Sequence, residues 1–168
     1  FALVVAISAA IKKLSLTAAT FLFILYSVIN GATLSLIFAV YTRTSIAQVF
    51  FITAGTFGVM SLYGYFTKKD LTSIGKLLLM ALIGLIIATL VNAFLVKSSG
   101  FDLILSYIGV LIFVGLTAWD TQKIKRMLAM QSDMGEGAQK IALLGALSLY
   151  LDFINLFLYL LRIFGNRN

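Results

Sequence analysis

The chain has 168 residues, of which 61% are hydrophobic and 11% are charged, and its mean hydropathy is +1.07. Soluble globular domains carry charged residues at about 25% of positions, so this composition excludes that class and indicates an integral membrane protein. The formal net charge of +7 does not indicate a nucleic-acid partner, because the Lys and Arg residues fall in short segments between apolar runs, where they set topology.

Six apolar segments follow one another along the chain, and a bilayer core about 30 Å thick needs roughly 20 apolar residues in a helix. The first segment, residues 1–11, is a partial span without the basic start of a signal peptide. We expect it to be the end of a helix whose beginning is missing from this chain. Five full spans are predicted at residues 14–41, 46–66, 77–96, 103–120 and 141–161.

The connectors between these spans alternate in charge. One side would carry nine basic residues, namely Lys12, Lys13, Lys68, Lys69, Lys76, Lys123, Lys125, Arg126 and Lys140. The other would carry Arg43, Lys97, Arg162 and Arg167. The positive-inside rule places the larger group in the cytoplasm and the C-terminus outside. An N-terminus in the cytoplasm then requires one more helix, which predicts an all-α, seven-helix parent protein.

Small residues recur at helical spacing on two spans. Ser27, Gly31 and Ser35 are spaced by four, and Ala54 with Gly58 repeats the pattern on the next span. Because helices in lipid gain van der Waals contact where small residues let backbones approach, these positions predict helix contacts.

The last span carries a polar stripe. Ser148, Asp152, Asn155, Tyr159 and Arg162 recur at intervals of four, three, four and three. Such a stripe cannot face acyl chains, so this helix should stand inside the bundle. Interhelical hydrogen bonds would explain the neutral members, but an ionisable group in the middle of a span usually marks an ion or proton path.

A second carboxylate, Asp120, ends the preceding apolar run. A helix cap or an ion pair with Lys123 would explain it equally well. One helical face also carries a set of residues that points Asp120 inward, namely Ser106, Gly109, Phe113 and Thr117.

Three stretches resemble the transmembrane Bax inhibitor motif family, in its bacterial inner-membrane branch. Residues 148–157, SLYLDFINLF, resemble the family's C-terminal signature, and residues 113–123, FVGLTAWDTQK, resemble its preceding helix. Residues 57–65 and 67–71 are similar to the bacterial branch. The resemblance implies a seven-helix bundle in the inner membrane, with the last helix surrounded by the other six.

The resemblance also implies a function, a pH-sensitive calcium leak channel gated by an aspartate pair. The pair would be Asp120 and Asp152, serving as proton sensor and weak calcium site. A basic latch residue is expected in the family, and Lys12 or Lys13 is the nearest candidate. Trp119 stands where relatives often have Tyr.

Two carboxylates about 4 Å apart repel by roughly 4 kcal/mol at an effective dielectric near 20, so they would share one proton and titrate together. Calcium takes 6–8 oxygen ligands, so the pair would need help from water or neighbouring groups. The candidate supporting residues are Asn30, Thr117, Ser148, Asn155 and Tyr159. One difficulty is that Asp152 follows Ile141 by about 17 Å of helix, whereas Asp120 ends its span. Either the last helix begins below the membrane, or a watery vestibule lets the two meet.

Two other functions are compatible with a membrane protein of this kind. The resemblance allows a regulatory protein that binds a membrane-embedded AAA protease. An intramembrane aspartyl protease is disfavoured, because no glycine element precedes either aspartate. With no histidine and no cysteine, imidazole bases, thiolates and the usual zinc or haem ligands are excluded. We therefore predict no catalytic residue, no enzyme activity and no cofactor; calcium and protons would be the transported species.

Overall fold

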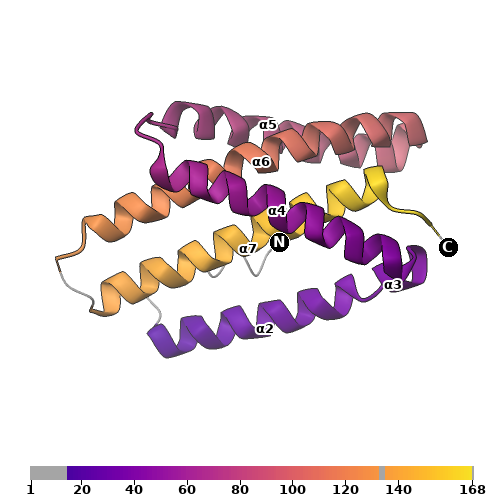
Figure 1. Ribbon diagram of the computed structural model, residues 1–168. Helices are drawn as coiled ribbons and strands as arrows, with labels where there is room; N and C mark the ends of the chain where they lie inside the picture. Colours follow the sequence, from indigo (N-terminus) through magenta and orange to yellow (C-terminus); the bar gives the residue numbers. More distant parts are fainter. Residues whose placement is uncertain (1–14, 133–134, 168) are drawn as a thin grey trace.

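The computed structural model describes residues 15–132 and 135–167, and these residues form helices with no β-strand (Figure 1). The elements are α2 (Leu16–Leu34), α3 (Ile37–Val40), α4 (Arg43–Phe66), α5 (Thr72–Val91), the π-helical turn η1 (Asn92–Val96), α6 (Ser99–Ala129) and α7 (Glu136–Phe164). Within the described part, five helical stretches are long and apolar enough to cross a membrane. The all-helical membrane fold is confirmed, whereas the count of seven stays a prediction and residues 1–11 lie outside the described residues.

Hydroxyl side chains fix the start of three helices. Ser15 accepts a hydrogen bond from Ala18 N at 3.2 Å, and Thr42 accepts one from Ser45 N at 3.3 Å. Ser98 does the same at the start of α6. Each cap satisfies a backbone N–H that has no partner inside its own helix, which makes these positions the natural helix starts.

Two helices are longer than their apolar runs predict. α6 continues to Ala129 rather than ending at Asp120, and α7 begins at Glu136 rather than Ile141. The 31 residues of α6 span about 46 Å, against a hydrocarbon core of about 30 Å. Its polar last turns remain helical because they project beyond the lipid core.

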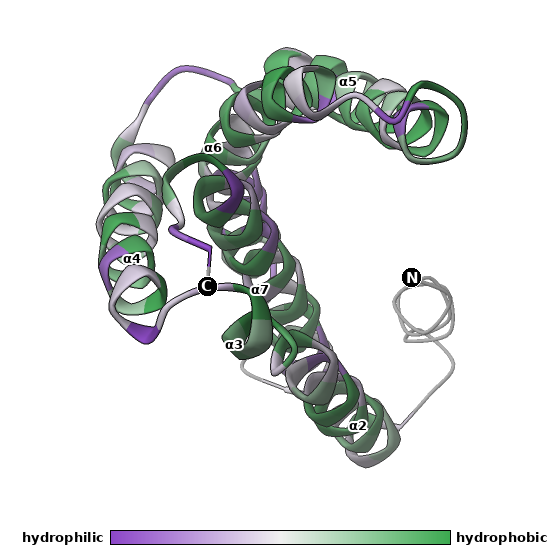
Figure 2. Cartoon of the chain, turned by 90° about the vertical axis from the view of Figure 1, so that its right-hand side faces the viewer, coloured by the Kyte–Doolittle hydropathy of each residue, from purple (hydrophilic) through white to green (hydrophobic). Residues whose placement is uncertain are grey.

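The helices pack around α6 and α7 (Figure 2). α6 contacts α4, α5 and α7, and α7 also contacts α4 and α2. Of the five spans, α6 is the most extensively buried. The prediction that the last helix lies inside the bundle therefore holds for its contacts with three neighbours, and α6 and α7 together carry most of the described core.

The small residues that form close helix contacts are not those predicted. A Cβ added at Gly31 or Gly58 would meet no atom within 4 Å, so the predicted contacts at these glycines are wrong for the described structure. A Cβ at Gly64 would instead overlap the Ala118 carbonyl, where α4 crosses α6. Spacing alone identifies small residues, but the rotation of each helix decides which of them meets a neighbour.

Candidate ion-pathway site

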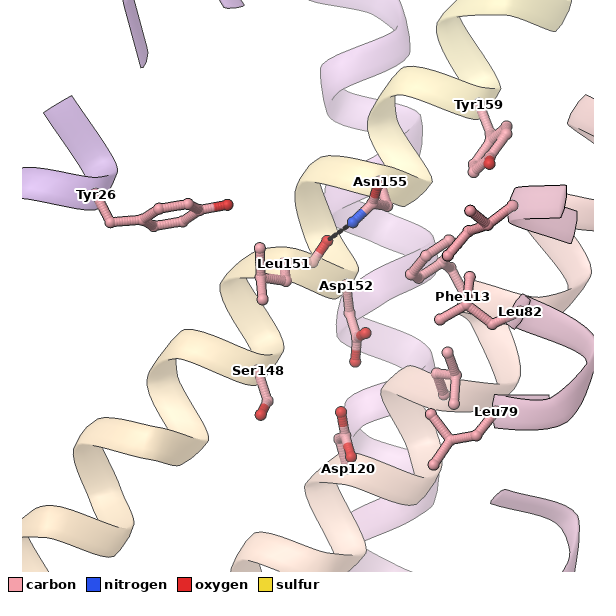
Figure 3. A pocket seen from close by; sticks show the side chains of 12 residues that line it. Tyr26, Leu79, Leu82, Phe113, Asp120, Ser148, Leu151, Asp152, Asn155 and Tyr159 are labelled. Atoms are coloured by element: carbon pink, nitrogen blue, oxygen red, sulfur yellow. Dashed lines mark hydrogen bonds between the residues drawn. The ribbon is translucent and has the colours of Figure 1, made fainter. Parts of the chain in front are cut away.

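The structure brings Asp120 of α6 and Asp152 of α7 together, with their carboxyl groups pointing toward one another (Figure 3). Asp152 is only 5% exposed, and no N–H or O–H group of the described residues donates to its Oδ2. Two ionised carboxylates are both acceptors, so a hydrogen bond between them requires that one of them carries a proton.

The early start of α7 removes the geometric difficulty. The helix has already made several turns before it reaches Asp152, and α6 runs on past Asp120. The two aspartates therefore come level with each other on the neighbouring helices α6 and α7.

Both carboxyl groups line a cavity of about 580 Å³ between α2, α5, α6 and α7 (Figure 3). Its polar lining consists of Tyr26, Asp120, Ser148, Asp152, Asn155 and Tyr159. The apolar lining consists of Leu79, Leu82, Ile86, Phe113, Leu116 and Leu151. The polar groups come mainly from the stripe on α7, so the stripe faces this cavity rather than lipid.

Three of the five predicted supporting residues line the cavity, and two do not. Ser148, Asn155 and Tyr159 are in the lining. Thr117 is fully buried and donates to the Phe113 carbonyl within its own helix at 2.7 Å. Asn30 donates its amide to the Tyr150 hydroxyl at 3.0 Å, so it joins α2 to α7.

The wall opposite the carboxyl pair is aromatic. Tyr159 stacks on Phe113 with ring centroids 5.9 Å apart, and a Cβ at Gly109 would lie 2.8 Å from the Tyr159 ring. Asn155 donates its amide to the Leu151 carbonyl at 2.8 Å, which leaves its side-chain oxygen for other contacts. Because Gly109 has no side chain, the Tyr159 ring can pack against α6 at this part of the cavity.

Comparison with known proteins identifies the family of this chain. The family model described as "Inhibitor of apoptosis-promoting Bax1" (Bax1-I) matches residues 1–168. The chain belongs to the Bax1-I family. The resemblance inferred from the sequence is thereby confirmed.

Relatives in the family span several bacterial groups. Inner membrane protein YbhL of Escherichia coli (strain K12) is 58% identical over 168 residues, which covers 99% of this chain and 71% of that protein. An uncharacterized protein of Borreliella burgdorferi is 54% identical, with coverage of 99% and 72%. Uncharacterized protein RP147 of Rickettsia prowazekii is 53% identical, with coverage of 92% and 65%.

In this Bax1-I chain, α6 is anchored close to Asp120 by a residue that sequence reasoning missed. Gln122 is 4% exposed; its Nε2 donates to the Lys69 carbonyl at 2.8 Å, and its Oε1 accepts from Leu71 N at 3.0 Å. Both partners lie in the loop between α4 and α5. The sequence shows a polar residue after the aspartate, but nothing in its spacing indicates a partner some 50 positions away.

An ion pair reinforces the same loop. Arg126 Nη1 lies 2.8 Å from Asp70 Oδ1 in an exposed ion pair. The pKa of Asp70 is held well below its ordinary value, first by hydrogen bonds from the Thr72 hydroxyl and backbone N–H and then by Arg126. Its ionised form is therefore favoured at every physiological pH.

Trp119, the residue before Asp120, packs against α5. Its ring fills the space that a Cβ at Gly75 would need, and the Lys123 ammonium lies 5.0 Å from the centre of the ring. The candidate latch residues Lys12 and Lys13 lie outside the described residues.

Proposed function

We propose that this protein is a multi-pass inner-membrane protein that lets calcium leak through the membrane, with the Asp120–Asp152 pair as its pH-sensitive gate. The observation that carries the proposal is the meeting of two carboxyl groups in a largely apolar cavity inside the membrane-spanning bundle. A structural hydrogen bond would not need two ionisable groups at that depth, where each is costly to bury.

In the closed state, one proton joins the two carboxyl groups and so joins α6 to α7. Losing that proton would leave two acceptors facing each other, with Oδ2 of Asp152 lacking a donor. Two like charges about 4 Å apart repel by roughly 4 kcal/mol at an effective dielectric near 20. Deprotonation therefore pushes the helices apart and frees carboxylate oxygens at the same moment.

Calcium is the cation that such a pair suits. It prefers carboxylate and carbonyl oxygens and takes 6–8 of them. Two aspartates supply at most four oxygens, and the described residues contain no group of three or more acidic, His or Cys side chains. Water, with Ser148 and the Asn155 oxygen, would complete the shell, so calcium would pass without being held tightly.

The test is calcium flux into proteoliposomes at acidic and neutral pH. Flux should rise with pH in the parent chain and lose its pH dependence in Asp120→Asn, Asp152→Asn and the double variant. Glu136→Gln is the matched control, because Glu136 lies in the exposed first turn of α7 and its ion pair with Lys140 is within that helix. A double variant with the parent's pH profile would remove the pair from the mechanism.

Regulation of a membrane-embedded AAA protease remains the alternative that the family resemblance suggests. No contact among the described residues favours it. Retention of the protease from solubilised membranes by a chain that conducts no calcium would support this alternative.

A further inference from the structure

One end of the molecule carries an excess of positive charge that the bundle itself does not neutralise. We call it the lysine-rich end; its described basic residues are Lys68, Lys69, Lys76, Lys123, Lys125, Arg126 and Lys140. Two acids of the described chain lie among them, Asp70 and Glu136, and each already pairs with one basic residue, Arg126 and Lys140 respectively. Asp133, in the connector before Glu136, lies outside the described residues.

Five lysines at this end thus lack an ion-pair partner in the described chain. They are Lys68, Lys69, Lys76, Lys123 and Lys125, and all five are exposed. At the opposite end, Arg162 pairs with Asp102 at 3.4 Å, whereas Arg43, Lys97 and Arg167 have no ion-pair partner among the described residues. The lysine-rich end thus has the larger concentration of exposed ammonium groups, which is suited to an anionic partner outside the protein.

The position of these lysines along their helices indicates which partner. From Ser99 to Lys123, α6 rises by about 36 Å, which exceeds a hydrocarbon core of about 30 Å even at a tilt of about 20°. The lysine therefore lies at the level of the lipid headgroups. Exposed aromatic rings at the end of α4, Tyr63, Tyr65 and Phe66, are the kind of residues found at this level.

One of the lysines has a fixed setting. The Lys123 ammonium lies 5.0 Å from the centre of the Trp119 ring, and that ring is 9% exposed and packs on Gly75 of α5. Lys76 follows Gly75 in the sequence and is exposed, so the two lysines lie on the adjoining helices α5 and α6. An ammonium group held at a buried ring keeps its outer side available to a phosphate headgroup.

We propose that the lysine-rich end binds the headgroups of anionic phospholipids, with Lys76 of α5 and Lys123 of α6 as its central contacts. Each lysine near an anionic membrane surface contributes about a fivefold gain in association. The partner is a lipid of the surrounding bilayer, and the binding does not require that the chain conduct calcium.

Trp119 makes the proposal directly measurable, because it is the one tryptophan in the sequence. The chain is reconstituted in phosphatidylcholine vesicles containing about one-third phosphatidylglycerol. Either the neutral or the anionic lipid is brominated near the top of its acyl chain. Brominated phosphatidylglycerol should quench Trp119 more strongly than brominated phosphatidylcholine at equal mole fraction, and added salt should weaken that preference.

Variants identify the lysines responsible. Lys76→Gln and Lys123→Gln should each lower the preference for the anionic lipid about fivefold. Lys123→Arg keeps the charge over the ring and should retain the preference, as should Lys97→Gln at the opposite end. Equal quenching by the two lipids, or a preference that survives in the double glutamine variant, would overturn the proposal. Neither result depends on flux, so it would leave the calcium hypothesis standing.

Discussion

Burying a polar group costs free energy unless the group is hydrogen-bonded. Two residues within one turn of α6, Asp120 and Gln122, meet this requirement in different ways. Asp120 faces another acid, so a hydrogen bond between the two requires a proton. Gln122 meets a backbone carbonyl and a backbone N–H, so its bonds are independent of pH. In the proposed gate, the contact between the acids would open while the bonds of Gln122 keep α6 in place.

Removing the permanent contact should lower stability. In Gln122→Ala, the Lys69 carbonyl and the Leu71 N–H lose their partners, and the expected cost is about 1–3 kcal/mol in the free energy of unfolding. The measurement is thermal or denaturant unfolding in detergent. Gln139→Ala, at an exposed position of α7, is the control and should stay within about 0.5 kcal/mol of the parent. Equal stability of the two variants would contradict the anchoring role.

At the scale of elements, α6 is the helix on which the others pack, and glycine sets how closely they approach. The crossing of α4 over α6 requires Gly64, because a Cβ there would overlap the Ala118 backbone. The same helix carries Gly58, where a Cβ would meet nothing within 4 Å. Substitutions at Gly58 and Gly64 can therefore distinguish the effect of a helix contact on stability from the intrinsic effect of glycine in a helix.

We expect opposite results from alanine at these two positions. Gly64→Ala should destabilise the protein by about 1–3 kcal/mol, because α4 and α6 must move apart. Gly58→Ala should be neutral or stabilising by up to about 1 kcal/mol, since alanine favours helix more than glycine does. Unfolding in detergent measures both. Destabilisation by Gly58→Ala of the same size would mean that another surface covers this face of α4.

At the scale of the whole molecule, the two ends differ in charge. Among the described residues, the lysine-rich end has five lysines without an ion-pair partner, whereas the other end has three such cations, Arg43, Lys97 and Arg167, besides the Arg162–Asp102 pair. Basic connectors remain in the cytoplasm during membrane insertion, so this asymmetry predicts the orientation of the bundle. The C-terminus follows α7 at the less basic end and is therefore expected outside.

The absence of cysteine makes this orientation simple to test. Arg43→Cys at the less basic end should react with a membrane-impermeant maleimide added to intact cells whose outer barrier has been opened. Lys68→Cys at the lysine-rich end should react only after the membrane is permeabilised. The reverse labelling pattern would place the C-terminus in the cytoplasm.

The sequence by itself determined that this is an all-helical membrane protein, because hydrophobic composition and the length of apolar runs are local properties. It also identified Asp120 and Asp152, since a carboxylate in an apolar run is conspicuous without any knowledge of its neighbours. Only the tertiary structure decided that the two meet, that Thr117 and Asn30 stay outside the cavity lining, and that Gly64 rather than Gly58 forms a helix contact. It likewise revealed the distant partners of Gln122. These facts depend on how far each helix extends and how it is rotated against its neighbours, which is fixed by packing between segments far apart in the chain.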